Sequence, residues 1–309
     1  MLRDAALRAA VLPAAVLAAA GACWGLTMPL LRIAASAGYP PLALLLWSNA
    51  LLAVLAGLVL VVTGRPWPRI RDNGPALLAI SVFGTALPGY FSFVSAAELP
   101  AGVRAIVIAM VPIFALPMAI LLGAERFELR RSAGLLLGLA AVGVLALPGA
   151  TVGAPGGAAG GSIPALYVLI AALSPLCYAL EANILSSRAA DLDPIGLLFA
   201  AGLLSVALTA PFALAFDAFV LPRSLGAAEL ALAAAAPVNL CAYVAYVWLT
   251  GHGGAVFAAQ VGYVVTVAGV LWGMILLGER PGPAVWLALA LMLAGIALVR
   301  PREAHAKDA

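Results

Sequence analysis

A carboxylate lies inside an apolar segment of this chain, at Glu181. With Ser174, Cys177 and Tyr178 it forms a stripe at the i, i+3, i+4 and i+7 positions of a helix. A charged group in a bilayer is costly unless it is sheltered or neutralised. An acid held in a low-dielectric cavity can exchange its proton near neutral pH, which makes Glu181 a proton-coupling candidate. The alternative is that Glu181 only reaches toward the headgroups near Arg188.

Polar and aromatic side chains recur in the other apolar segments, and we expect most of them to face the interior of the bundle. Rings offer apolar faces and cation–π contact, and amides hydrogen-bond a carboxylate. This mixture favours an amino acid or an amphiphilic metabolite over a phosphorylated molecule, because Arg32 and Arg104 are the only nearby cations and both are peripheral. Each residue could instead only tie helices together. The candidates for substrate contact are Trp24, Met28, Asn49, Tyr90, Tyr178, Glu181, Asn239, Tyr243, Gln260 and Tyr263.

Arg32 follows Trp24 and Met28 at steps of four residues, each of which advances about 6 Å along a helix. It could be a gate charge or an anion contact near the outer end of the first span. The alternative is that Arg32 extends to the outer headgroups.

The sequence has no motif typical of an enzyme. It lacks a Gly-x-Ser-x-Gly elbow, a His-Glu-x-x-His metal motif and a phosphate loop. The two histidines are expected in a glycine-rich loop (His252) and in the tail (His305). We therefore expect no enzyme activity, no catalytic residue, no metal and no cofactor. The three cysteines lie within apolar segments and are interpreted as packing residues.

These side chains belong to ten apolar segments that are long enough to cross a bilayer, which takes about 20 residues. Charged residues make up 9% of the chain and hydrophobic residues 65%, with a mean hydropathy of +1.13, so no water-soluble surface can be built. The runs are continuous rather than alternating, which favours helices over a barrel. The expected spans are Leu12–Ala35, Pro41–Val62, Pro75–Ala97, Ala101–Gly123, Ser132–Leu147, Ile163–Leu185, Pro194–Phe216, Ala227–Leu249, Ala255–Leu277 and Pro283–Val299.

Lys and Arg indicate the orientation of these spans. With the N-terminus in the cytoplasm, 12 of the 16 basic residues fall on the inner side, so both termini are expected to be cytoplasmic. The net charge of +3 reflects this asymmetry and does not indicate a nucleic-acid surface. The N-terminal residues imitate a signal peptide, but apolar sequence continues to Leu31, so we expect an uncleaved first helix. The expected location is a bacterial inner membrane.

The two halves of the chain repeat each other. Trp24 and Tyr178, and likewise Glu125 and Glu279, are 154 residues apart. With five spans per half, the second copy must enter the membrane from the opposite side, and such inverted repeats place a site near the midplane. Chance similarity between apolar segments is the alternative. The expected units are a first repeat (1–148), a Gly/Ala-rich linker (149–162), a second repeat (163–300) and a polar cytoplasmic tail (301–309).

Glycines spaced four residues apart predict close helix packing. They occur at Gly21/Gly25, Gly134/Gly138 and Gly269/Gly273, and those of the fifth span could alternatively mediate a homodimer. In-span prolines are expected to kink their helices, and they are Pro29, Pro88, Pro112, Pro117, Pro175, Pro211 and Pro237.

Over about residues 10–300 the chain resembles the drug/metabolite transporter superfamily, in particular its ten-helix EamA-type members. It departs from them at Tyr178-Ala179, where a second Trp-Gly would stand, and at Gly262-Tyr263-Val264-Val265, where many members have a proline. The resemblance implies a substrate:proton antiporter or facilitator, usually an exporter in bacteria. The matching residues are Trp24-Gly25, Pro112, Glu125, Gly134, Gly138, Gly143 and Glu279.

Together these observations predict an all-α polytopic membrane protein built as two inverted five-helix repeats. Its expected function is secondary transport of a small organic metabolite, an amino acid or an amphiphilic compound, in the direction of export, by alternating access with proton coupling. Its expected partners are a small-molecule substrate and the lipid bilayer. The alternatives are a transporter of phosphorylated sugars or nucleotides, and a membrane scaffold or receptor without transport.

Overall fold

The computed structural model describes residues 2–68, 70–121, 128–147, 165–188, 192–222, 225–258 and 260–299. Within these ranges all of the regular secondary structure is helical. A single π-helix, η1 (Ser81–Ala86), joins two of the α-helices. The α-helices are α1 (Leu2–Ala35), α2 (Pro41–Thr63), α3 (Ile70–Ile80), α4 (Leu87–Glu98), α5 (Ala101–Ile108), α6 (Val111–Leu121), α7 (Leu129–Ala146), α8 (Ala165–Arg188), α9 (Pro194–Ala215), α10 (Ala227–Ala258), α11 (Val261–Leu277) and α12 (Pro283–Val299).

Eight helical stretches in the described residues are long and apolar enough to cross a bilayer, and two shorter apolar helices accompany them. The shorter two are α11 and α12, each of 17 residues. At 1.5 Å per residue, 17 residues reach about 26 Å, slightly less than a hydrocarbon core of about 30 Å. Large apolar side chains cover the outside of the bundle, among them Val61 and Val62 on α2, which are 65% and 76% exposed. Such a surface requires lipid around it.

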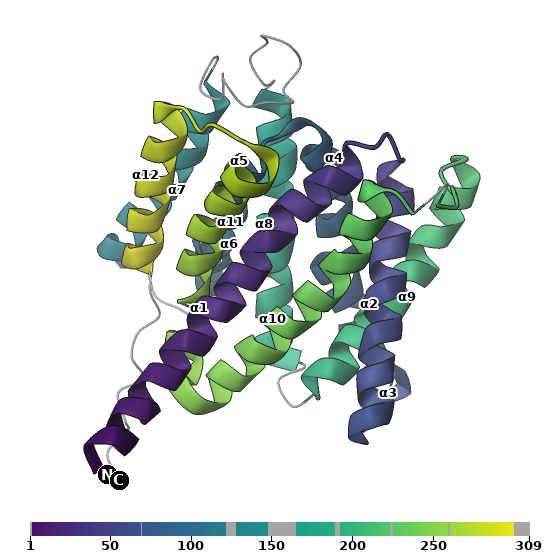
Figure 1. Ribbon diagram of the computed structural model, residues 1–309, viewed down its shortest axis with the longest axis horizontal. Coiled ribbons are helices and arrows are strands. Elements are labelled where there is room, and N and C mark those ends of the chain that lie inside the picture. Colours follow the sequence, from purple (N-terminus) through teal and green to yellow (C-terminus); the bar gives the residue numbers. More distant parts are fainter. Residues whose placement is uncertain are drawn as a thin grey trace.

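Helices from the two halves of the chain alternate in the bundle (Figure 1). The long helices α1 and α10 cross the front of the view and pack on each other. On the left α7 packs against α12, and on the right α2 packs against α9. Behind α1, α8 packs against α4 and α6. The halves are therefore interlocked helix by helix rather than joined at one flat surface.

Glycines allow these crossings to be close. A Cβ at Gly25 on α1 would lie 2.7 Å from the Cβ of Ala268 and 2.8 Å from the backbone nitrogen of Gly269 on α11. A Cβ at Gly295 on α12 would lie 2.8 Å from the carbonyl oxygen of Gly134 on α7. The predicted close packing at these glycines is present within one chain, where Gly134 faces α12.

Two expected spans are interrupted. The third contains η1 directly before Pro88, and the fourth is divided into α5 and α6 by a turn at Ala109 and Met110, directly before Pro112. A proline lacks a backbone N–H and its ring displaces the carbonyl four residues earlier, so the regular hydrogen-bond ladder cannot continue through these positions. The two interruptions lie beside Pro88 and Pro112, whereas the other five predicted prolines lie inside helices that continue past them.

Other boundaries also differ from the expectation. Helix α10 continues to Ala258, so His252 lies in a helix rather than in the expected loop. Its ring stacks on that of Trp248, with ring centres 4.1 Å apart. Glycine lowers helix stability by only about 1 kcal/mol per residue, and packing of α10 against α1 outweighs it. Helix α11 consequently begins at Val261, later than predicted. The expected linker 149–162 and tail 301–309 lie outside the described residues.

Replacing Gly25 tests the close crossing of α1 and α11. We expect Gly25→Ala to lower the free energy of unfolding by about 1–3 kcal/mol, because the added methyl group meets backbone atoms that cannot move aside. The matched control is Gly143→Ala on α7, where a Cβ meets no atom within 4 Å. Thermal unfolding in detergent measures both variants. Equal melting temperatures for the two variants would contradict the close crossing.

Candidate functional site

A cavity of about 200 Å³ lies between the halves of the chain. Its wall comes from α1, α2, η1, α4 and α5 of the first half and from α8 and α10 of the second. The wall is mostly apolar, with hydroxyl groups, two amides and one guanidinium group among its side chains. The polar residues that line it are Thr27, Ser48, Asn49, Thr85, Ser92, Ser95, Arg104, Ser174, Tyr178 and Asn239.

Hydrogen bonds to neighbouring helices fix the two amides of the cavity. The indole nitrogen of Trp24 donates to Oδ1 of Asn239 over 2.7 Å, which joins α1 to α10. The amide nitrogen of Asn49 donates to the hydroxyl oxygen of Ser205 over 3.0 Å, which joins α2 to α9. Because each bond crosses between the halves, the position of both amides depends on how the two halves are packed.

The residues beside Pro88 are fixed in a similar way. The hydroxyl of Ser174 on α8 donates a hydrogen bond to the Pro88 carbonyl oxygen over 3.0 Å. The same hydroxyl lies 3.2 Å from that of Ser92 on α4. These contacts join α8 to α4 next to η1, at the wall of the cavity.

The structure brings some of the predicted contact residues together and places others elsewhere. Four of the ten line the cavity: Met28, Asn49, Tyr178 and Asn239. Trp24 lies behind Asn239, to which it is bonded, and also packs against Tyr246 with ring centres 5.6 Å apart. Tyr243 lies within electrostatic range of Glu181. Both residues therefore adjoin the site without forming its wall.

Three predicted contact residues lie away from the cavity. Tyr90 is 37% exposed and packs edge-on against Phe91, because it stands five residues, or about 140° of helical rotation, from the cavity-lining Thr85. Gln260 forms the turn between α10 and α11, where its backbone N–H donates to Phe257. Tyr263 packs against the apolar cluster of α5, α6, α7 and α12.

Glu181 approaches the cavity through a gap left by a glycine. Its carboxylate lies against Gly84 of η1, where any Cβ would overlap the carboxylate group. Gly84 itself lines the cavity, and so does Tyr178 one helical turn away from Glu181. Within the part of the chain that the structure describes, no hydrogen bond or ion pair is formed by the Glu181 carboxylate. The Glu181 side chain is half-buried, and it lies directly behind the cavity wall at Gly84.

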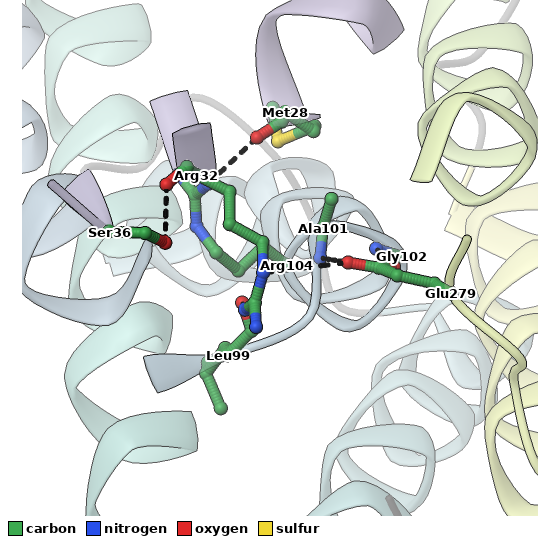
Figure 2. Close-up of polar contacts among 8 residues, drawn as sticks. All are labelled: Met28, Arg32, Ser36, Leu99, Ala101, Gly102, Arg104 and Glu279. Carbon is green, nitrogen blue, oxygen red and sulfur yellow. Dashed lines mark hydrogen bonds and ion pairs between the residues drawn. The ribbon is translucent and has the colours of Figure 1, made fainter. Parts of the chain in front are cut away.

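A second carboxylate, Glu279, is buried at the end of the bundle where α1 ends and α5 begins (Figure 2). Its two oxygens accept hydrogen bonds from the backbone N–H groups of Ala101, at 2.6 Å, and Gly102, at 3.0 Å. These are unpaired N–H groups in the first turn of α5, where the helix dipole also favours a negative charge. Glu279 therefore caps α5 from the other half of the chain.

Local sequence places Glu279 in this position. Helix α11 ends at Gly278, whose φ of 63° is left-handed and turns the chain back toward α5. A Cβ at Gly273 would lie 2.5 Å from the nearer Glu279 carboxylate oxygen, so the glycine leaves room for the side chain. The Gly269/Gly273 pair thus admits Ala105 of α5 at one position and the carboxylate at the other.

Arg32 completes this arrangement, and we call Glu279, Arg32 and the first turn of α5 the carboxylate cap. Nε of Arg32 lies 3.8 Å from a Glu279 oxygen, and the guanidinium group donates a hydrogen bond to the carbonyl of Leu99. Arg32 is only 5% exposed, so it does not extend to headgroups, which was the alternative. The repeat-related Glu125 lies outside the described residues.

The apolar helical bundle defines a multi-pass membrane protein. The EamA-like transporter family matches residues 12–147 and again residues 165–300, so the chain belongs to this family of membrane transporters of small molecules. A solved structure described as "Crystal structure of protein" is 21% identical, with a TM-score of 0.60 over 93% of this chain and 97% of that chain, and it supports the fold. A search of curated proteins found no match.

Glu279→Gln tests the carboxylate cap. The amide would present N–H groups to at least one of the α5 N–H donors and would leave Arg32 without its buried counter-charge. Removing one member of a buried pair costs about 3–5 kcal/mol, so we expect a melting temperature lower by about 5 °C or more. The control is Asp217→Asn, which neutralises an exposed carboxylate at a left-handed position (φ 50°) that asparagine tolerates. A Glu279→Gln protein as stable as this control would contradict the cap.

Proposed function

We propose that the protein is a secondary transporter that moves a small organic metabolite by alternating access, in the direction of export. The observation that carries this proposal is the cavity, whose polar side chains come from both halves of the chain. In transporters built from inverted repeats, the substrate lies where the copies meet, and rocking of one against the other exposes it to each side in turn. A membrane scaffold would need no such cavity, and a receptor is distinguished from a carrier by the transport experiment below.

The same proposal includes the placement in the membrane. Ten spans, with the shorter α11 and α12 among them, would leave both termini in the cytoplasm and the carboxylate cap on the outer side. The distribution of Lys and Arg supports this orientation. We propose a bacterial inner membrane as the location.

The size and charge of the cavity support a small cargo. Pockets for drug-sized ligands occupy about 300–1,000 Å³. At about 200 Å³ this cavity suits an amino acid or a similar metabolite better than a nucleotide. Its wall carries one cationic side chain among the described residues, Arg104, whereas a phosphorylated sugar or nucleotide would require more positive charge.

Glu181 is the proposed site of proton coupling. Its carboxylate lies directly behind Gly84 at the cavity wall, without a described hydrogen-bond partner. Binding of a proton or of a cationic cargo would lower the free-energy cost of the carboxylate in this position, because no described group near it pairs with its charge. Alternate occupation by proton and cargo would couple their movements.

Counterflow in sealed proteoliposomes tests transport itself. We expect vesicles loaded with an unlabelled amino acid to take up the labelled compound transiently, whereas vesicles without protein should not. The panel should contain amino acids, amphiphilic drugs and sugar phosphates, because these represent the competing cargo classes. A sealed preparation that trades none of them would favour a scaffold or receptor.

Glu181→Gln separates transport from proton coupling. We expect this variant to retain counterflow, which needs no net proton movement, and to lose uphill accumulation driven by a pH gradient by about tenfold or more. Retained counterflow also shows that the variant is folded. Asp217→Asn, at an exposed carboxylate, is the control and should keep both activities. Undiminished gradient-driven accumulation in Glu181→Gln would remove Glu181 from the coupling mechanism.

A further inference from the structure

The one charged side chain found in the described cavity wall belongs to Arg104, one turn inside α5. Arg104 is only 5% exposed, so its guanidinium group has been removed from water almost completely. Burying a cation is costly unless hydrogen bonds and an opposite charge compensate for it. The partners of Arg104 therefore indicate what its position is suited to bind.

Arg104 has little compensation within the chain. One of its guanidinium nitrogens donates to the carbonyl oxygen of Met28 over a long 3.3 Å, and within the described residues no carboxylate lies within 4.0 Å of it. Glu279 forms its ion pair with Arg32 and its hydrogen bonds with the first turn of α5 instead. Arg32 and Glu279 both act on Arg104 at longer range, with opposite signs. Figure 2 shows the two arginines side by side, with Glu279 directed at α5.

A guanidinium group has five N–H donors in a planar fork, and it binds a carboxylate through two parallel hydrogen bonds. With a single described bond to Met28, Arg104 retains most of its donors. Two further polar residues, Tyr178 and Asn239, line the same cavity. Tyr178 lies within electrostatic range of Arg104, and the Asn239 oxygen is occupied by Trp24, which leaves the Asn239 amide N–H groups as donors.

We propose that Arg104 binds the carboxylate of the transported molecule, which makes a free carboxylate group the defining feature of the substrate class. The inference rests on the proposed function, because it takes the cavity to be the place that cargo occupies. The carboxylate would supply a directly bonded counter-charge, because no carboxylate of the described residues lies within 4.0 Å of Arg104. Arg104 is then a substrate-binding residue, distinct from the arginine of the carboxylate cap.

The surroundings favour a carboxylate over a phosphate group. A phosphate ester carries up to two negative charges and three acceptor oxygens near neutral pH. The described wall offers one cation, and Glu181 lies behind Gly84 on the same cavity. A second negative charge on the cargo would therefore lack a partner and meet a nearby acid. A single carboxylate is neutralised by Arg104 alone.

The test compares acids with their amides on the wild-type protein. Purified protein is heated with each proteinogenic amino acid, with the corresponding amino acid amide, and with glucose 6-phosphate and ribose 5-phosphate. We expect at least one acid to raise the melting temperature and to bind about 10–100 times more tightly than its amide, the range for loss of a hydrogen bond to a charged group. This comparison needs no variant and does not depend on refolding a mutant.

Variants then assign the effect to Arg104. Arg104→Gln should reduce the preference for acid over amide by about tenfold or more, and Arg104→Lys should restore part of it, because lysine keeps the charge but not the planar fork. The matched control is Arg280→Gln, which removes an exposed arginine at the same end of the bundle and should keep the full preference. Equal affinity for acid and amide, tighter binding of either phosphate, or no stabilisation by any acid would overturn the proposal.

Counterflow with the same compounds separates this inference from the proposed function. If an acid binds with the expected preference but is never exchanged, the result supports the carboxylate site and contradicts the proposed transport function. If amides or phosphates are exchanged as well as acids, transport stands and the carboxylate requirement falls. An Arg104→Gln protein that exchanges acids at the wild-type affinity would likewise remove Arg104 from the site.

Discussion

The buried carboxylate of Glu279 sets the arrangement of the helix ends around it. An ionised carboxylate is tolerated in an apolar interior only when its oxygens are hydrogen-bonded and its charge is balanced. Here the compensation comes from two N–H groups of α5 and from Arg32 of α1, while Glu279 itself follows α11. Three helices from both halves must therefore meet at one point. The packing of α1 on α11 and the position of Arg104 one turn further along α5 follow from that meeting.

The opposite end of the bundle is fastened by a more exposed acid. Asp193 caps α9 by accepting from the N–H groups of Ile195 and Gly196, and it pairs with Arg65 at 2.9 Å. The Arg65 side chain is 46% exposed, and an ion pair of that kind contributes only about 0–1 kcal/mol because water and salt screen it. Each acid therefore caps a helix: Glu279 caps a helix of the other half, and Asp193 caps the helix that follows it. Of these two carboxylates, Glu279 is the one buried from solvent.

Much of the fold could be predicted from the sequence because composition and length determine it. The family resemblance is confirmed, and expected spans such as those of α2, α9 and α12 agree with the helices to within a residue or so. The interruptions were only partly foreseen. Prolines mark where a helix is weakened, but whether the chain responds with a kink, a π-helix such as η1 or a turn such as Ala109–Met110 depends on what packs beside it.

The site was harder to predict, for a physical reason. Periodicity shows which face of one helix is polar, and it identified Met28, Asn49, Tyr178 and Asn239, which line the cavity. It does not show how far each helix is shifted along its neighbours. Arg104 was therefore assigned to the periphery, because an arginine near the end of an apolar segment can usually reach water. The cap formed by Glu279 and Arg32 joins residues that are far apart in the sequence, and no local pattern specifies such a contact.

The two arginines have no counterparts in the second repeat. At the 154-residue interval that relates Glu125 to Glu279, the positions matching Arg32 and Arg104 are Ser186 and Ala258. Two identical inverted copies would make the inward-open and outward-open forms equivalent by a two-fold rotation about an axis in the membrane plane, and therefore equal in energy. A cationic pair in one copy alone removes that degeneracy. For a carrier of the proposed kind, these charges would contribute to an unequal population of the two forms, although the duplicated halves share one architecture.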